Sequence, residues 1–294
     1  MPSFETDGVT LHYQQHGARA NPLVLLIHGL SCQLIHWPAT LIDRLTTAGY
    51  RVVTFDNRDA GLSSRVDWAD VGTPEDVLAA PTAVKPPYSL ADLARDAVSV
   101  LDYLGQSGAH LVGVSMGGMV AQQAALDVPE RVFSITSIAS STSDPDLPGG
   151  DPAAFRAFVA TPPRERKAAI AHMQAGWRII GGPHYDAARV GLGRFAEQAY
   201  DRGHSVAGTA RQLLAILHAR PRGEALRELE IPGLVIHGAA DPMVPVAAGE
   251  RTAERLRHGE LTVYEKLGHD LPEPLLDDMG ERIIRHLDNV PTRR

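Results

Sequence analysis

The stretch that decides the fold reads AHLVGVSMGG and covers residues 109–118. Its first six residues form an apolar run that predicts a buried strand, and the residues after the serine favour a helix. Ser115 lies between the two, with Gly113 and Gly117 on either side of it. A turn this sharp brings strand and helix so close that a Cβ at either glycine would collide with neighbouring backbone. The segment therefore predicts an exposed serine oxygen that can act as a nucleophile.

Strands and helices alternate on both sides of this segment. Residues 23–28 are apolar on both faces, which is typical of a central parallel strand, whereas residues 9–16 alternate and indicate an edge strand. This order predicts an α/β fold with a doubly wound, mostly parallel sheet. We expect further strands over 51–55, 109–114, 132–138, 233–237 and 261–264, and helices over 38–48, 90–104 (with Ser89 as N-cap), 116–126, 246–256 and 274–286.

The alternation stops between residues 141 and 224, where no convincing strand occurs. We interpret residues 141–224 as a helical cap inserted into one α/β core, made of residues 1–140 and 225–294. Within this cap, helices are expected over 152–160, 164–177, 186–200 and 209–219. In the core, residues 66–87 are rich in Pro, Asp and Ala and are expected to be irregular.

A serine nucleophile needs a base with a pKa near the operating pH, which histidine supplies. His269 follows the last predicted strand, and Asp241 follows the strand before it. Because parallel strands end at one edge of a sheet, we expect both at the same edge as Ser115. Asp270 is the competing acid, but neighbouring side chains rarely point at each other. Asp241 could also be a turn residue before Pro242.

Two backbone N–H groups are candidates for stabilising an oxyanion. Met116 follows the serine at a helix N-terminus, where the peptide dipoles favour negative charge. Leu30 lies in the loop after the first central strand and is the candidate second donor. His28 in the same loop is interpreted as a histidine that fixes the loop rather than as a second base.

Composition and motif content argue against several classes of partner and site. The 294 residues carry a formal net charge of −7 with no basic block, which argues against nucleic-acid binding. No His-Glu-x-x-His or comparable cluster appears, so a catalytic metal is not expected. The single cysteine, Cys32, excludes an intrachain disulfide and is treated as small and apolar. No signal peptide or membrane-crossing run is seen, so a cytoplasmic protein without stable membrane insertion is expected. The sequence does not determine the oligomeric state, and a homodimer is one alternative.

Together these motifs resemble the α/β-hydrolase superfamily, and within it esterases related to aclacinomycin methylesterase and to mycobacterial lipase/esterase proteins. The resemblance implies the order Ser, Asp, His for the triad, a helical cap over the site, and cofactor-free hydrolysis of carboxylic esters. Serine at position 115 argues against dehalogenases and epoxide hydrolases of this fold, whose nucleophile is a carboxylate. The motifs that carry the resemblance are His28-Gly29, residues 56–63, residues 113–118, Asp241-Pro242 and Gly268-His269, with 185–200 and 208–216 for the esterases.

The expected substrate is a small molecule, a moderately hydrophobic ester. Gln33 and Trp37 follow the oxyanion loop and are candidates to face it, although Trp37 could equally be a core residue. Met173 and Trp177 are the candidates from the cap, with Ile179, Ile180, Phe195, Tyr200, Leu213, Leu214 and Leu217 as further apolar positions. The same triad would also serve a carbon–carbon hydrolase, a perhydrolase, a thioesterase or a lysophospholipase. A ligand receptor with slow turnover is the alternative from another class.

Overall fold

The computed structural model describes residues 2–185 and 192–290, and these contain an eight-stranded sheet. The strands are β1 (Ser3–Thr6), β2 (Val9–His16), β3 (Leu23–Ile27), β4 (Arg51–Phe55), β5 (Ala109–Val114), β6 (Val132–Ile138), β7 (Gly233–Gly238) and β8 (Gly259–Tyr264). Their order is β1-β2-β4-β3-β5-β6-β7-β8. Strands β3 to β8 run parallel, whereas β2 is antiparallel to β4 and β1 is antiparallel to β2. The predicted mostly parallel α/β fold is confirmed.

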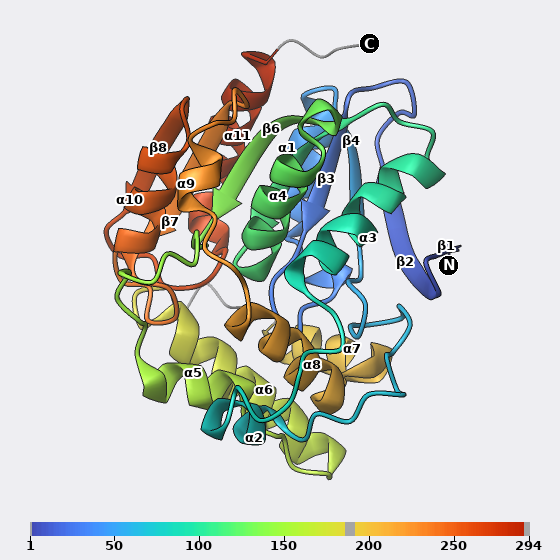
Figure 1. Ribbon diagram of the computed structural model, residues 1–294, viewed down its shortest axis with the longest axis vertical. Coiled ribbons are helices and arrows are strands. Elements are labelled where there is room, and N and C mark those ends of the chain that lie inside the picture. The colour runs from blue at the N-terminus through green and yellow to red at the C-terminus, as the bar shows by residue number, and fades with distance from the viewer. Residues whose placement is uncertain (1, 186–191, 291–294) are drawn as a thin grey trace.

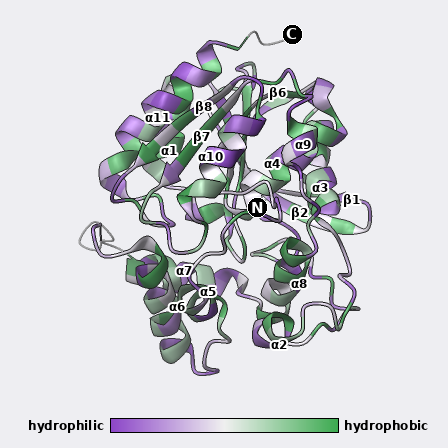
Figure 2. Ribbon diagram, turned by 60° about the vertical axis from the view of Figure 1, so that its left-hand side comes forward, coloured by the Kyte–Doolittle hydropathy of each residue, from purple (hydrophilic) through white to green (hydrophobic). Residues whose placement is uncertain are grey.

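Helices cover both faces of this sheet. They are α1 (Ala39–Thr47), α3 (Leu90–Tyr103), α4 (Met116–Asp127), α10 (Val246–Arg255) and α11 (Glu273–Asp288). Successive residues of β3 point to opposite sides, so Leu25 packs with α3 and α4 while Leu26 packs with α1 and α11. Figure 2 shows the central strands as hydrophobic and much of the outer surface of α10 and α11 as hydrophilic. Burial on both faces explains why β3 reads as a continuous apolar run.

The prediction that residues 9–16 form an edge strand is wrong. β1 pairs with β2 in a hairpin whose register joins Thr6 to Val9. The two residues between them, Asp7 and Gly8, both have positive φ, at 43° and 78°. An Asp-Gly pair at such a turn is a strong hairpin signal, because both central residues of a type I′ turn need positive φ. The four residues of β1 are too few to show a period by themselves.

The helix N-cap predicted at Ser89 is confirmed. The Ser89 side chain accepts a hydrogen bond from the backbone N–H of Asp92, and the Asp92 carboxylate accepts one from Ser89 N–H at 2.7 Å. This reciprocal pair satisfies two donors that the start of α3 would otherwise leave unpaired.

The helices α5 (Pro152–Val159), α6 (Arg166–Gly181), α7 (Leu192–Gly203) and α8 (Val206–Leu217) lie together beyond the carboxyl ends of the parallel strands (Figure 1). We call them the helical layer. A short helix, α9 (Gly223–Leu226), follows α8 before the chain enters β7. The helix expected over 186–200 is described only from residue 192, and residues 186–191 lie outside the described part.

The expectation of an irregular segment over 66–87 is wrong in one place. Residues Pro74–Ala79 form α2, which packs against α8 and lies beside the helical layer in Figure 1. Thr73 caps this helix and exchanges hydrogen bonds with Asp76, so the sequence Thr-Pro-Glu-Asp carried a capping-box signal. Among the described residues, no helix combines the length and the apolar character needed to cross a membrane.

Candidate active site

Ser115 occupies the sharp turn between β5 and α4. Its φ is 56° and its ψ is −120°, a conformation that non-glycine residues rarely adopt and that persists only where the surroundings enforce it. A Cβ at Gly113 would lie 2.2 Å from the carbonyl oxygen of Gly117, and one at Gly117 would lie 1.9 Å from that of Ile27. Both glycines are therefore required by close backbone packing around the serine.

His269 and Asp241 meet at the same edge of the sheet, in the loops after β8 and β7. His269 Nδ1 lies 2.7 Å from Asp241 Oδ2, and both side chains are buried. Because an ionised carboxylate only accepts hydrogen bonds, Nδ1–H donates and Nε2 carries the free lone pair. The other carboxylate oxygen accepts the backbone N–H groups of Met243 and Val244 at 2.8 and 2.9 Å. The carboxylate is thus fixed in orientation before it orients the imidazole.

The helical layer helps to hold the His269 loop. His269 N–H donates to the carbonyl of Ile180 at 2.8 Å, at the end of α6. A Cβ at Gly268 would lie 2.5 Å from the carbonyl oxygen of Gly181, so only glycine permits this approach. The position of the imidazole therefore depends on α6 as well as on the sheet.

Two opposing effects set the charge on His269. Burial lowers its pKa, whereas the charge of Asp241 and its hydrogen bond raise it, and the net pKa lies above the usual 6.5. His28 differs, because burial lowers its pKa to about 3 and its Nδ1 accepts the N–H of Gly29. His28 is therefore neutral at physiological pH and fixes the loop after β3, as the sequence suggested.

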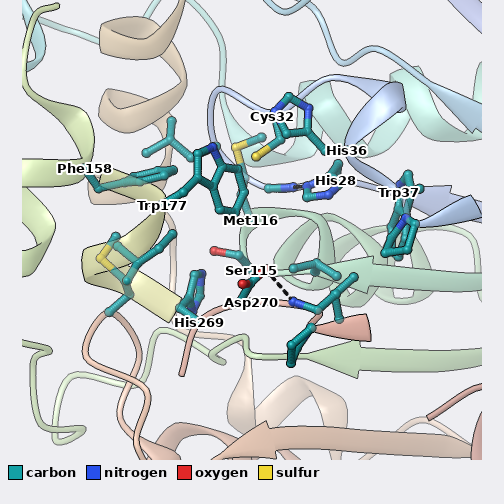
Figure 3. A pocket seen from close by; sticks show the side chains of 18 of the residues that line it. His28, Cys32, His36, Trp37, Ser115, Met116, Phe158, Trp177, His269 and Asp270 are labelled. Atoms are coloured by element: carbon teal, nitrogen blue, oxygen red, sulfur yellow. Dashed lines mark hydrogen bonds between the residues drawn. The ribbon is translucent and has the colours of Figure 1, made fainter. Parts of the chain in front are cut away.

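A cavity of about 450 Å³ contains Ser115 and His269 in its lining. Met116 and Leu30, the two candidates for oxyanion donors, line it as well. The chain at Gly29 passes so close that a Cβ there would lie 3.1 Å from the Cβ of Ser115. Figure 3 shows Ser115 near the centre of the group of lining side chains, with His269 below it and Trp177 and Phe158 above it. The volume lies in the range of small-molecule sites, about 300–1,000 Å³.

The four predicted pocket residues divide into two pairs. Trp37 and Trp177 line the cavity, and Trp37 also packs in the core beside α1 and α11. Gln33 and Met173 are not among its lining residues. Gln33 is buried and donates to the carbonyl of Ala199 at 2.6 Å, so it joins the loop after β3 to α7 instead. Of the further apolar positions, Ile180 and Phe195 line the cavity, whereas Ile179, Tyr200, Leu213, Leu214 and Leu217 do not.

Aromatic rings that sequence reasoning did not single out complete the cavity. His36 stacks on Trp177 at 5.6 Å between ring centroids and meets Phe195 edge-on at 4.2 Å. Phe158 meets Trp177 edge-on at 5.7 Å. Burial holds the pKa of His36 well below its usual value, so this ring is neutral. Burial also raises the pKa of the Cys32 thiol in the same lining, which keeps it protonated and unreactive.

Two buried acids in the loop after β4 attach the helical layer to the core. Asp56 accepts the N–H of Leu34 at 2.7 Å and pairs with Arg202 of α7 at 3.1 Å. Asp59 forms a two-point ion pair with Arg211 of α8, at 2.6 and 2.9 Å. Both acids lie in the motif 56–63, which carried the family resemblance without a stated role. Their partners lie far along the chain, so no local sequence pattern predicts the pairing.

The fold and this cavity define a hydrolase, and comparison with known proteins gives its family. Residues 22–273 match the family described as alpha/beta hydrolase fold, so the chain belongs to that family. The family predicted from the motifs is confirmed.

Among its relatives, rhodomycin D methylesterase DauP of Streptomyces sp. (strain C5) is 28% identical over 304 residues, and the match covers 95% of each chain. Rhodomycin D methylesterase DnrP of Streptomyces peucetius is 28% identical over 309 residues, again with 95% of each chain covered. Among solved structures, the enol-lactonase from Burkholderia xenovorans LB400 superposes with a TM-score of 0.76 at 21% identity, covering 98% of this chain and all of that one. The last likeness shows the fold alone.

Proposed function

We propose that this chain is a serine hydrolase that cleaves carboxylic esters through an acyl-enzyme on Ser115. The observation that carries the proposal is the cavity lined by Ser115, which has a strained backbone, and by His269, which Asp241 holds at 2.7 Å. The methylesterases that the chain resembles support the same chemistry. In this proposal Ser115, Asp241 and His269 are the catalytic residues.

The reaction has two halves. His269 Nε2 takes the proton of the Ser115 hydroxyl while the serine oxygen attacks the ester carbonyl carbon. The N–H groups of Leu30 and Met116 stabilise the oxyanion of the tetrahedral intermediate. When this collapses, the carbon–oxygen bond to the alcohol breaks, and the alcohol leaves with the proton from His269. Water then attacks the acyl-enzyme in the same way and releases the acid and the free serine.

The substrate we propose is an ester with a bulky, largely apolar group. The aromatic side chains of the cavity favour stacking on flat or hydrophobic groups, and such contacts contribute about 0.5–1.5 kcal/mol per ring pair beyond area burial. Trp177, Phe158 and Phe195 come from the helical layer. We therefore propose that residues 141–224 form a cap that selects the substrate, over a core of residues 1–140 and 225–294 that performs the reaction.

A panel of substrates tests the proposed reaction against its alternatives. The purified protein is given a p-nitrophenyl ester, a methyl ester of an aromatic acid, an acyl thioester and a vinylogous diketone. We expect the highest kcat/KM on the two oxygen esters. A higher kcat/KM on the diketone would assign carbon–carbon hydrolysis instead, and a higher value on the thioester would assign a thioesterase. If a fluorophosphonate labelled Ser115 but none of the four substrates were turned over, the result would favour a ligand receptor.

The pH profile tests which acid supports the base. Activity requires neutral His269, so kcat/KM should rise with pH through the folded-state pKa, which lies above 6.5. Asp241→Asn removes the charge that raises this pKa while burial continues to lower it, so the midpoint should shift to lower pH. We also expect kcat to fall by roughly 10³–10⁴-fold, because an amide can stabilise the wrong tautomer of the imidazole.

Asp270→Asn is the matched control, because Asp270 is the competing acid next to His269. Its charge raises the pKa of His269 less than that of Asp241 does. The variant should therefore shift the midpoint of the kcat/KM–pH profile only slightly and keep most of the activity. If Asp270→Asn lost more activity than Asp241→Asn, the acid would have been assigned to the wrong residue.

A further inference from the structure

A second cavity of about 630 Å³ lies beside the one that contains Ser115. Its walls come from α2, α5 and the end of α8, and include Leu78 and Leu217. Two residues, Phe155 and Met243, line both cavities. They form a shared wall between the space next to the serine and the space between the helices. None of the roles derived above uses the second cavity.

One half of this wall is fixed. Met243 is buried, and its N–H donates to Asp241 Oδ1 at 2.8 Å. The start of α5 is docked against the same loop, because Asp151 N–H donates to the carbonyl of Pro242 at 2.7 Å. A Cβ at Gly150 would lie 2.1 Å from the carbonyl oxygen of Met243, so the two segments are in backbone contact. Neither Met243 nor the backbone of α5 can move without disturbing the Asp241 loop.

The other half of the wall is the side chain of Phe155, which has fewer contacts with other rings than its neighbour Phe158. Phe158, one turn further along α5, is held edge-on against Trp177 at 5.7 Å. Among the described residues, no ring–ring contact involves Phe155, although it packs against apolar side chains of two clusters. Rotation of Phe155 about its side-chain bonds therefore breaks no aromatic pair.

We propose that the second cavity extends the substrate site, that Phe155 separates the two spaces, and that the extension binds a long apolar arm of the ester. This rests on the proposed function, with Ser115 as the nucleophile. Most of the lining is apolar, with Leu78, Leu217 and Met243 among it, and its two charged residues, Glu75 and Arg156, have exposed side chains. Glu75 at the exposed rim already accepts two hydrogen bonds from Thr161, at 2.6 and 2.7 Å, so the rim does not call for a cationic ligand.

The test compares long and short substrates in two series. One series pairs p-nitrophenyl butyrate with p-nitrophenyl decanoate, and the other pairs butyl butyrate with decyl butyrate. Leu78→Trp fills the second cavity at a residue that does not line the first, and Phe155→Ala opens the wall. Leu261→Trp is the matched control, because Leu261 is 40% exposed on β8 and lines neither cavity. Thermal melting checks that each variant is folded.

In one of the two series, Leu78→Trp should lower the long-to-short ratio of kcat/KM by at least about tenfold, because each methylene kept from apolar contact costs about fourfold. Phe155→Ala should raise the same ratio, and Leu261→Trp should leave it unchanged. The proposal is overturned if Leu78→Trp leaves the ratio unchanged in both series, or lowers long and short substrates equally. If Leu78→Trp is unfolded, an unchanged ratio for Phe155→Ala overturns it. Wild-type protein without activity on either butyrate would instead contradict the proposed function.

Discussion

Ser115→Ala is expected to lower kcat on p-nitrophenyl butyrate by a factor on the order of 10⁵, because removing the nucleophile of a serine triad eliminates the covalent route. The fold should survive, since the carbonyl of Ser115 would still accept the hydroxyl of Ser140 at 2.7 Å and the backbone turn is unchanged. Alanine is also no bulkier than serine at this positive φ. The measurements are initial rates with excess enzyme, together with thermal melting of both proteins.

Ser107→Ala provides the control, because Ser107 is an exposed serine in the loop before β5. It should match the wild type in both rate and melting temperature. A folded Ser115→Ala protein with an undiminished rate would show that another group carries the reaction.

Arg211→Met is expected to have the largest effect on stability, lowering the free energy of unfolding by about 3–5 kcal/mol, the usual cost of breaking a buried ion pair. The Arg211 and Asp59 side chains are 2% and 0% exposed. Without the guanidinium, the donors to the buried Asp59 carboxylate among the described residues would be the N–H of Val66 and the hydroxyl of Tyr88, at 2.9 and 2.8 Å. Urea unfolding at pH 7 measures the change.

Arg166→Met separates burial from charge pairing. Arg166 and Asp201 form the same two-point contact, at 2.9 and 2.7 Å, but both side chains are more than half exposed. Water solvates Asp201 when the arginine is lost, so the free energy of unfolding should change little. If Arg211→Met lowered the free energy of unfolding as little as Arg166→Met does, the buried pair would not anchor α8.

The meeting of the three site residues at one edge of the sheet was predictable, because neighbouring parallel strands all end at the same edge. Once β5, β7 and β8 are recognised from their apolar runs, the residues that follow them must lie at one edge, and this brings Ser115, Asp241 and His269 together. The strand β1 was missed because its four residues carry no clear period. The Asp7-Gly8 turn was the stronger signal for it.

The cavity was harder to predict, because its shape depends on how the helical layer docks. That docking depends on pairs such as Asp59 with Arg211, which are 152 residues apart in sequence. Apolar periodicity shows which faces of the helices in the helical layer are buried, but not which residues of the core they pack against. For this reason Met173 and Gln33 were expected at the substrate, whereas Phe155 and Phe158 were not singled out.

The most direct test of the central claim is to map the residue that a fluorophosphonate modifies. Wild-type protein is treated with the reagent, its esterase activity is followed, and its peptides are analysed by mass spectrometry. We predict one modification, on the peptide that contains Ser115, with activity lost in proportion to labelling and no label on Ser115→Ala. Full esterase activity in completely labelled protein, or a label on a different residue that accompanies the loss, would contradict an acyl-enzyme on Ser115.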